Sequence, residues 1–206
     1  MTTPQLGRPV GADGEKTRRR IIGATMRCVA ATGYSKTTIR QIAREANVTS
    51  ASLYNYFPNK SELIKATVSA RADIALPRLR AAAQRPGSVV DRLDAVLDES
   101  GQLMREYPDL AAFEWAIRAE GAVSVYPGAV GDVGFQAMRG IIEGVIDDGV
   151  RQGTLGRNAD AQGAVEVIYA LIHGLTELAA TASPDRYQST LQAAKQLIRG
   201  SLFDHG

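Results

Sequence analysis

A group of polar side chains without a carboxylate gathers around position 53 of the sequence. Hydroxyl and amide groups donate hydrogen bonds without repelling phosphate, so a short helix that carries them suits the major groove of DNA. The members are Ser50, Ser52, Tyr54, Asn55 and Tyr56. Among them, Asn55 is the best candidate for reading a base, because its amide can pair bidentately with adenine.

Residues 37–57 must position this group, and their pattern predicts two short helices joined by a tight turn. Thr37 or Thr38 can cap the first helix, and Asn47 can adopt the left-handed conformation that ends it. Thr49 is placed to cap the second helix. The stretch therefore predicts a helix-turn-helix that presents its second helix to DNA.

Basic residues concentrate in the same part of the chain. Residues 1–66 hold 11 Lys and Arg against 4 Asp and Glu, about +7, whereas the remainder holds 13 against 18, about −5, which together give the net +2. Lys60 follows Pro58 and Asn59 in the first turn of an expected helix, where its ammonium can meet a phosphate. The run at residues 18–20 is three arginines, which suit either a phosphate backbone or an ordinary solvated surface.

The motif resembles the helix-turn-helix of the TetR family of bacterial transcriptional regulators (the TetR/AcrR type). The resemblance covers about 26 positions without a gap, and its most specific part is the run 53–60. The residues that carry it are Thr38, Ile39, Ile42, Ala43, Ala46, Val48, Thr49, Leu53, Tyr54, Tyr56, Phe57, Lys60 and Leu63. The resemblance implies an all-α fold, in which an N-terminal three-helix DNA-binding domain precedes a helical ligand-binding and dimerisation domain.

The expected domain bounds are 1–14 for a disordered tail, 15–62 for the DNA-binding domain and 63–206 for the second domain. The residues expected at DNA are Thr38, Arg40, Thr49, Ser50, Ser52, Tyr54, Asn55, Tyr56 and Lys60. Carried over from the family, Thr38, Tyr54, Tyr56 and Lys60 hold phosphates. The sequence departs from the commonest family pattern at Ser50 and Ala51, where lysine and glycine are frequent, so no operator sequence carries over.

Helical periodicity continues through the second domain without any sustained strand alternation. Pro77 is expected to end or kink one helix, and residues 121–134 read as a loop or broken helix. Asn158 or Asp160 can cap a later helix. Segment 164–179 is apolar on more than one face, which predicts a partner. In the resembling family the last two helices form the homodimer, and closed two-fold pairing fits a palindromic operator.

The resemblance also implies a cavity for an unknown small-molecule effector among the central helices. The bulky or polarisable candidates for its lining are Met104, Tyr107, Phe113, Trp115, Phe135, Met138, Tyr169 and His173. For any single one of these side chains, filling the hydrophobic core is the simpler reading. The pattern does not separate the two readings.

The sequence gives little support for a metal site, a catalytic site or a membrane-spanning segment. One cysteine, Cys28, and two histidines at no recognised metal spacing predict no metal site, and we expect no cofactor. No nucleophile motif or phosphate-binding glycine loop is present, so an enzyme is not expected. No run of eighteen apolar residues occurs, and a cytoplasmic protein is expected.

The sequence thus predicts a homodimeric DNA-binding regulator, most simply a repressor that a small molecule releases from a palindromic operator. Whether the effector releases or promotes DNA binding stays open. The alternative is a helical protein-interaction domain that retains the motif without binding an operator.

Overall fold

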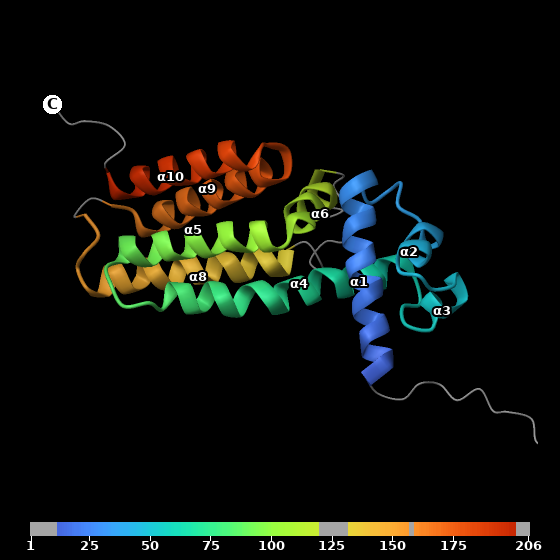
Figure 1. Ribbon diagram of the computed structural model, residues 1–206. Helices are drawn as coiled ribbons and strands as arrows, with labels where there is room; N and C mark the ends of the chain where they lie inside the picture. Colours follow the sequence, from blue (N-terminus) through green and yellow to red (C-terminus); the bar gives the residue numbers. More distant parts are fainter. Residues whose placement is uncertain (1–11, 120–131, 157–158, 201–206) are drawn as a thin grey trace, which may run out of the picture.

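The computed structural model describes residues 12–119, 132–156 and 159–200, and every regular element within them is an α-helix (Figure 1). The predicted all-α fold is confirmed. The helices are α1 (Ala12–Thr32), α2 (Ile39–Glu45), α3 (Ser50–Tyr54), α4 (Lys60–Ala83), α5 (Val89–Glu106), α6 (Pro108–Ala119), α8 (Asp132–Arg151), α9 (Ala161–Thr181) and α10 (Pro184–Arg199).

The first three helices form a small unit at one end of the molecule, to the right in Figure 1. Their shared core contains Ile21, Ile42, Leu53 and Leu63, all fully buried. Helix α1 begins at Ala12, so the expected disordered tail is wrong at residues 12–14. Asp13 and Glu15 lie in its first turn, where carboxylates stabilise the positive end of the helix dipole.

Helix α4 starts beside this unit and continues into the rest of the protein. It passes the expected domain boundary at residues 62 and 63 without interruption. It also contains Pro77 in its interior and continues to Ala83, so the expectation that Pro77 ends the helix is wrong. One helix therefore connects the α1–α3 unit to the larger part.

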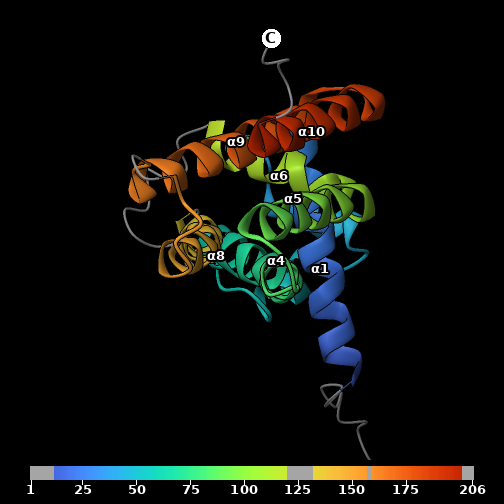
Figure 2. The same ribbon diagram turned by 90° about the vertical axis from the view of Figure 1, so that its left-hand side faces the viewer.

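The larger part, called the body here, consists of α4, α5, α6, α8, α9 and α10 (Figures 1 and 2). Helices α9 and α10 lie side by side across one side of it, and α4 and α8 lie on the opposite side (Figure 2). A single cluster of buried residues, including Leu97, Leu103, Ile142 and Leu191, joins these layers. Helix α6 instead packs against α1 and α9, so it links the body to the first unit.

The helix ends follow local rules that the sequence anticipates. Asp160 caps α9, accepting bonds from the N–H groups of Gln162 and Gly163 at 3.1 and 3.0 Å. Residues 120–131 of the expected loop at 121–134 lie outside the described residues. The last three positions of that loop are helical, because α8 already begins at Asp132, which corrects the prediction there.

Candidate nucleic-acid interface and effector cavity

The helix-turn-helix is held by its own capping groups. The Thr38 hydroxyl accepts a bond from the Gln41 N–H at 3.2 Å, and the Gln41 side-chain oxygen accepts one from the Thr38 N–H at 2.8 Å, which completes a capping box. Asn47 has φ 51°, in the left-handed region as predicted. The Thr49 hydroxyl accepts the Ser52 N–H at 3.0 Å and starts α3. The geometry of the turn therefore follows from four side chains near it in sequence.

The side chains predicted to meet DNA lie on α2, α3 and the start of α4. Thr38, Arg40, Thr49, Tyr54 and Asn55 are exposed, and Tyr54 is 51% exposed despite its aromatic ring. The half-buried members are Ser50, Ser52, Tyr56 and Lys60. An exposed phenol and amide on a short helix form a surface that a major groove can accept. The structure brings the predicted residues together, and their contacts with DNA remain a prediction.

Lys60 has an additional role that the sequence did not indicate. Its ammonium donates to the main-chain oxygen of Tyr34 and lies 4.2 Å from the centre of the Tyr34 ring. The contact with the ring is a cation–π interaction, which fixes the lysine against the loop between α1 and α2. An ammonium has three N–H donors, and the Tyr34 carbonyl accepts from one of them. Tyr34 thus positions the residue expected to hold the DNA backbone.

The arginine run at residues 18–20 is largely structural. The Arg20 Nε donates to the carbonyl of Ala46 at 2.7 Å, at the C-terminal end of α2. The Arg18 guanidinium lies 5.3 Å from the centre of the Phe57 ring, and Arg19 pairs with Glu15 at 3.1 Å. Arg18 and Arg20 therefore tie α1 to the helix-turn-helix. The sequence suggested either a phosphate contact or a solvated surface for this run, and the described contacts of Arg18 and Arg20 add an internal role to these two readings.

A small, partly open cavity lies in the body between α4, α5, α6, α8 and α9, with a volume of about 40 Å³. Its lining is apolar apart from four polar side chains, among them the ion pair between Arg71 of α4 and Glu114 of α6. Two methionines, Met104 and Met138, lie at its wall. The cavity thus touches both α4, which continues to the DNA-binding unit, and α6, which packs against α1.

Comparison with known proteins agrees with this geometry. Residues 21–67, which include the whole helix-turn-helix, match the sequence model described as "Bacterial regulatory proteins, tetR family". The transcriptional regulator SrpR of Pseudomonas putida is 29% identical over 174 residues, which cover 82% of this chain and 78% of SrpR. The chain belongs to the TetR family. It is therefore a transcriptional regulator with a DNA-binding helix-turn-helix.

Two further similarities bear on the TetR-family assignment. BetI of Escherichia coli O17:K52:H18, also a transcriptional regulator, is 39% identical over 85 residues, which span 39% of this chain but only 43% of BetI. The structure of FadR from Bacillus subtilis in complex with stearoyl-CoA has a TM-score of 0.74 at 16% identity, covering 90% of this chain and 99% of FadR. The second similarity concerns the fold alone. These relatives are regulators and not enzymes.

The structure places the eight predicted effector-cavity residues of this TetR-family chain in different surroundings. Met104 and Met138 line the cavity, whereas Tyr107 and Trp115 are 42% and 37% exposed and do not line it. Phe113 is fully buried in a separate cluster that joins α6 to α1 and α4. The rings of Tyr169 and His173 contact each other in a tilted arrangement, with ring centres 4.3 Å apart and an interplanar angle of 58°. The side chain of Phe135 lies outside the described part.

Arg71 and Glu114 were not among the residues that the sequence suggested for the cavity. A signal was present for Glu114, which shares a helix face with Leu110 and Ile117, four residues before it and three after it. A carboxylate on an apolar face predicts a buried cation as its partner. Arg71 had no comparable signal, because it stands in a helix with charged residues on several faces.

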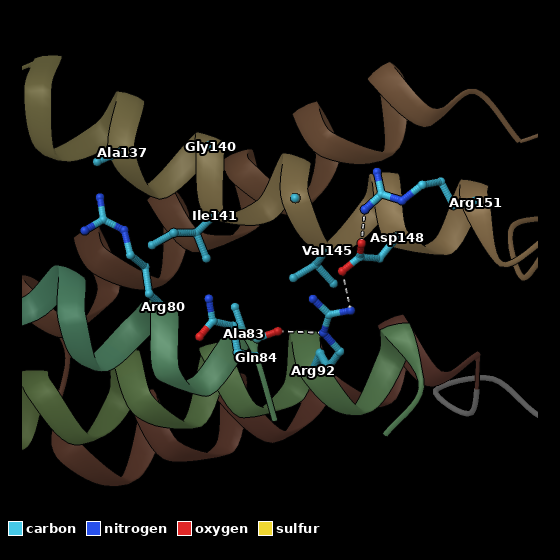
Figure 3. Close-up of a pocket in the computed structure, with 11 residues that line it drawn as sticks. Arg80, Ala83, Gln84, Arg92, Ala137, Gly140, Ile141, Val145, Asp148 and Arg151 are labelled. Atoms are coloured by element: carbon cyan, nitrogen blue, oxygen red, sulfur yellow. Dashed lines mark hydrogen bonds and ion pairs between the residues drawn. The ribbon is translucent and has the colours of Figure 1, made fainter. Parts of the chain in front are cut away.

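A second, open hollow of about 530 Å³ lies between α4, α5 and α8 (Figure 3). Arg92 crosses its floor, donating to the carbonyl of Ala83 at 2.6 Å and pairing with Asp148 at 2.7 Å; Arg151 also pairs with Asp148. The hydrogen bond from Arg92 lowers the pKa of Asp148 below its usual value. These contacts fasten the last turn of α4 and the start of α5 to α8.

Helix α9 carries apolar residues on its outward face. It is long and apolar enough to cross a membrane by length and composition, and 22% of its most apolar window is buried. Val167 is 65% exposed, and the neighbouring α10 exposes half of Leu197. Gly174 is also exposed, and a Cβ added there would meet no atom within 4 Å. The predicted apolar surface on the last two helices is therefore present in the folded chain.

Proposed function

We propose that this TetR-family protein is a homodimeric repressor that a small molecule releases from a palindromic operator. The observation that carries the DNA-binding part is the exposed polar face of α3, with Tyr54 and Asn55 uncovered and Lys60 held beside it. A helix that displays hydroxyl and amide donors but no carboxylate suits the major groove. The cytoplasm is the compartment in which such a bacterial protein meets its DNA.

The apolar face of α9 and α10 supports the homodimer. A soluble protein seldom exposes a contiguous apolar surface without a partner, and a second copy can cover Val167 and Leu197 at once. The exposed Gly174 has no side chain, so the backbone of a partner helix can approach closely there. A two-fold dimer would place two α3 helices at successive major grooves, about 34 Å apart.

The cavity lined by Met104 and Met138 supports the response to a small molecule. FadR, which shares the fold, is described in complex with stearoyl-CoA, so a helical body of this kind accommodates a ligand in at least that protein. In the present chain the cavity touches α4, whose first turn carries Lys60. A ligand that prefers a different position of α4 by a few kcal/mol would change the separation of the two α3 helices. We propose that this change lowers DNA affinity.

The experiment that tests the DNA-binding part measures fluorescence anisotropy with labelled DNA from upstream of the protein's own gene, over a range of salt concentrations. Lys60→Ala should weaken binding and reduce the slope of log K against log [salt] by about one, because one phosphate contact is lost. Lys195→Ala is the matched control, since Lys195 lies on α10 and pairs with Asp98 at 2.8 Å. An unchanged slope for Lys60→Ala would remove that residue from the phosphate contacts.

A measurement of molecular mass in solution tests the assembly. Light scattering should give the mass of two chains, about twice 22.0 kDa. Replacing Val167 with Lys should shift the equilibrium toward the monomer, because an exposed apolar contact would become a desolvated charge. A monomer for the unchanged protein at micromolar concentration would contradict the two-fold arrangement.

A further inference from the structure

The ion pair at the cavity wall is unusual because both of its side chains are nearly buried. Arg71 is 12% exposed and Glu114 is 7% exposed, and their closest atoms, Nη1 and Oε1, are in direct contact. Removing two charges from water costs free energy that their attraction only partly offsets. A well-packed apolar pair would fill the same space without that cost. Stability alone therefore does not explain the presence of these two residues.

The Arg71 guanidinium also has an unused donor. Its Nε is buried and has no hydrogen-bond partner among the residues that the structure describes. A buried N–H without an acceptor is costly, and such groups in folded proteins call for a specific explanation. Because Nη1 is directed to Glu114, the guanidinium can keep that ion pair and still offer Nε to another acceptor.

The other cavity residues offer little to Nε. Neither hydroxyl of the lining, Ser100 nor Thr176, accepts a hydrogen bond from Nε, and the Thr176 hydroxyl donates to the carbonyl of Ile172 at 2.9 Å. Most of the remaining wall is aliphatic, and it includes Leu79, Leu103 and Met138. Methionine side chains are flexible, so Met104 and Met138 can move to enlarge a space of about 40 Å³. An apolar molecule with one acceptor oxygen would match this wall.

We propose that Arg71 Nε–H donates a hydrogen bond to an acceptor oxygen of the effector, and that the effector is an uncharged, mostly apolar molecule such as a ketone, ester or lactone. Glu114 holds the guanidinium in place and neutralises it. A carboxylate in the cavity would bring an uncompensated negative charge beside a neutral pair, and an ammonium would compete with Arg71 for Glu114. The inference deepens the proposed function and depends on its effector cavity.

The position of Arg71 gives the bound molecule a route to the DNA-binding unit. Arg71 lies about three turns along α4 from Lys60. The far end of the same helix is fastened to α8 through Arg92 and Asp148, as Figure 3 shows. A molecule held by Arg71 thus acts between the fixed end of α4 and the end that carries the DNA-binding unit.

The test uses two probes of nearly the same shape, acetophenone and α-methylstyrene, which differ by a carbonyl oxygen against a methylene group. Their dissociation constants for the full chain are measured by ligand-observed NMR. The ratio of the two constants isolates the oxygen, because the apolar part is shared. The preference for acetophenone over α-methylstyrene, given by the ratio of their dissociation constants, should be about tenfold larger in the wild type than in the double variant Arg71→Met/Glu114→Leu. A difference of about tenfold is the effect expected of one hydrogen bond from a charged donor.

The double variant removes both charges together, so it leaves no unpaired buried ion and should fold. Arg78→Met/Glu99→Leu is the matched control. It removes an ion pair between α4 and α5, at 2.6 Å, whose members do not line the cavity, and it should keep the wild-type ratio. An equal ratio in the wild type and the cavity variant would overturn the proposal, as would failure of acetophenone to bind the wild type at millimolar concentration.

Two charged probes test the class of molecule. Benzoate and 1-phenylethylammonium should each bind the wild type more weakly than acetophenone, and tighter binding of either would overturn the uncharged class. DNA affinity is measured separately without any probe. A protein that shows the ratio change but binds no DNA contradicts the proposed repressor and leaves the Arg71 site standing. The reverse result contradicts the site alone.

Discussion

The two ends of this molecule are held together in different ways. In the α1–α3 unit, the turn depends on side chains that bond within three residues of themselves, such as Thr38 with Gln41 and Thr49 with Ser52. In the body, ion pairs join helices far apart in the sequence, such as Arg71 with Glu114 and Arg199 with Asp94. The first kind of contact fixes a local surface, and the second fixes how helices lie against each other.

The difference suggests that the α1–α3 unit and the body have different functions. A surface that reads DNA must keep one shape, and local caps give it that shape wherever the unit moves. The response to an effector requires helices that can change position, and contacts between helices are the ones that such a change alters. Four perturbations, taken from the largest expected effect to the smallest, test whether the two ends are as independent as this contrast implies.

The largest effect is expected at the buried ion pair. Glu114→Leu leaves the Arg71 guanidinium buried without its partner and should lower the free energy of unfolding by about 3–5 kcal/mol. Adding Arg71→Met should recover most of the loss, because no charge is then stranded. Urea denaturation measures both. A loss below about 1 kcal/mol in the single variant would mean that water reaches the pair and that it behaves as a surface contact.

The second-largest effect is expected in the α1–α3 unit, and it concerns recognition of the DNA sequence and not protein stability. Asn55→Ala should reduce discrimination at one base position by about 1–3 kcal/mol, because an amide paired with adenine is lost. The exposed side chain should contribute little to folding. Anisotropy titrations against operators substituted one position at a time measure the loss. Equal weakening on every operator would assign Asn55 to the backbone contacts instead.

The two capping boxes allow a matched comparison of the ends. Thr38→Ala in the first unit and Ser88→Ala in the body each remove a hydroxyl that caps a helix. Each should cost about 1 kcal/mol of stability, by thermal or urea denaturation. Only the Thr38 variant should also weaken DNA binding, since Thr38 is exposed beside the proposed interface. Equal weakening by both variants would show that the ends are coupled.

The smallest effect is a dependence on pH. Hydrogen bonds from Arg78 and then Gln102 lower the pKa of Glu106 from its ordinary 4.5 to about 2. A lowered pKa in the folded state contributes stability above pH 4.5, and the contribution is lost as the pH falls toward 2. The stability difference between wild type and Arg78→Gln should therefore shrink over that range. Because Glu106 is well exposed, salt should also reduce this stability difference. A stability difference that stays constant from pH 6 to 2 would contradict the view that Arg78 lowers the pKa of Glu106.

The helix caps and the turn of the helix-turn-helix could be predicted from the sequence because each of them depends on neighbouring residues. The left-handed Asn47 and the caps at Thr38, Thr49 and Asp160 all follow from residue type and spacing, and the structure confirms them. The family resemblance rests on the same stretch. The apolar face of α9 was predictable for a similar reason, since periodicity alone reveals it.

The rest depends on contacts that spacing does not reveal. Nothing local indicates that Arg20 reaches Ala46 or that Lys60 reaches Tyr34, because each pair is 26 residues apart. The cavity was the least predictable part. Bulky residues such as Phe113 and Trp115 attract attention, yet one fills the junction with α1 and the other faces solvent. Pro77 does not end α4, because the helix packs along much of its length and that packing offsets the hydrogen bond that a proline removes.

The central claim is that two copies of this chain read DNA together through α3. Selection of bound sequences from random DNA, with the unmodified protein at physiological salt, tests it most directly. The expected result is enrichment of two inverted half-sites whose centres lie about 34 Å apart or a multiple of that distance. Enrichment of a single asymmetric site, or of no sequence at all, would contradict the claim.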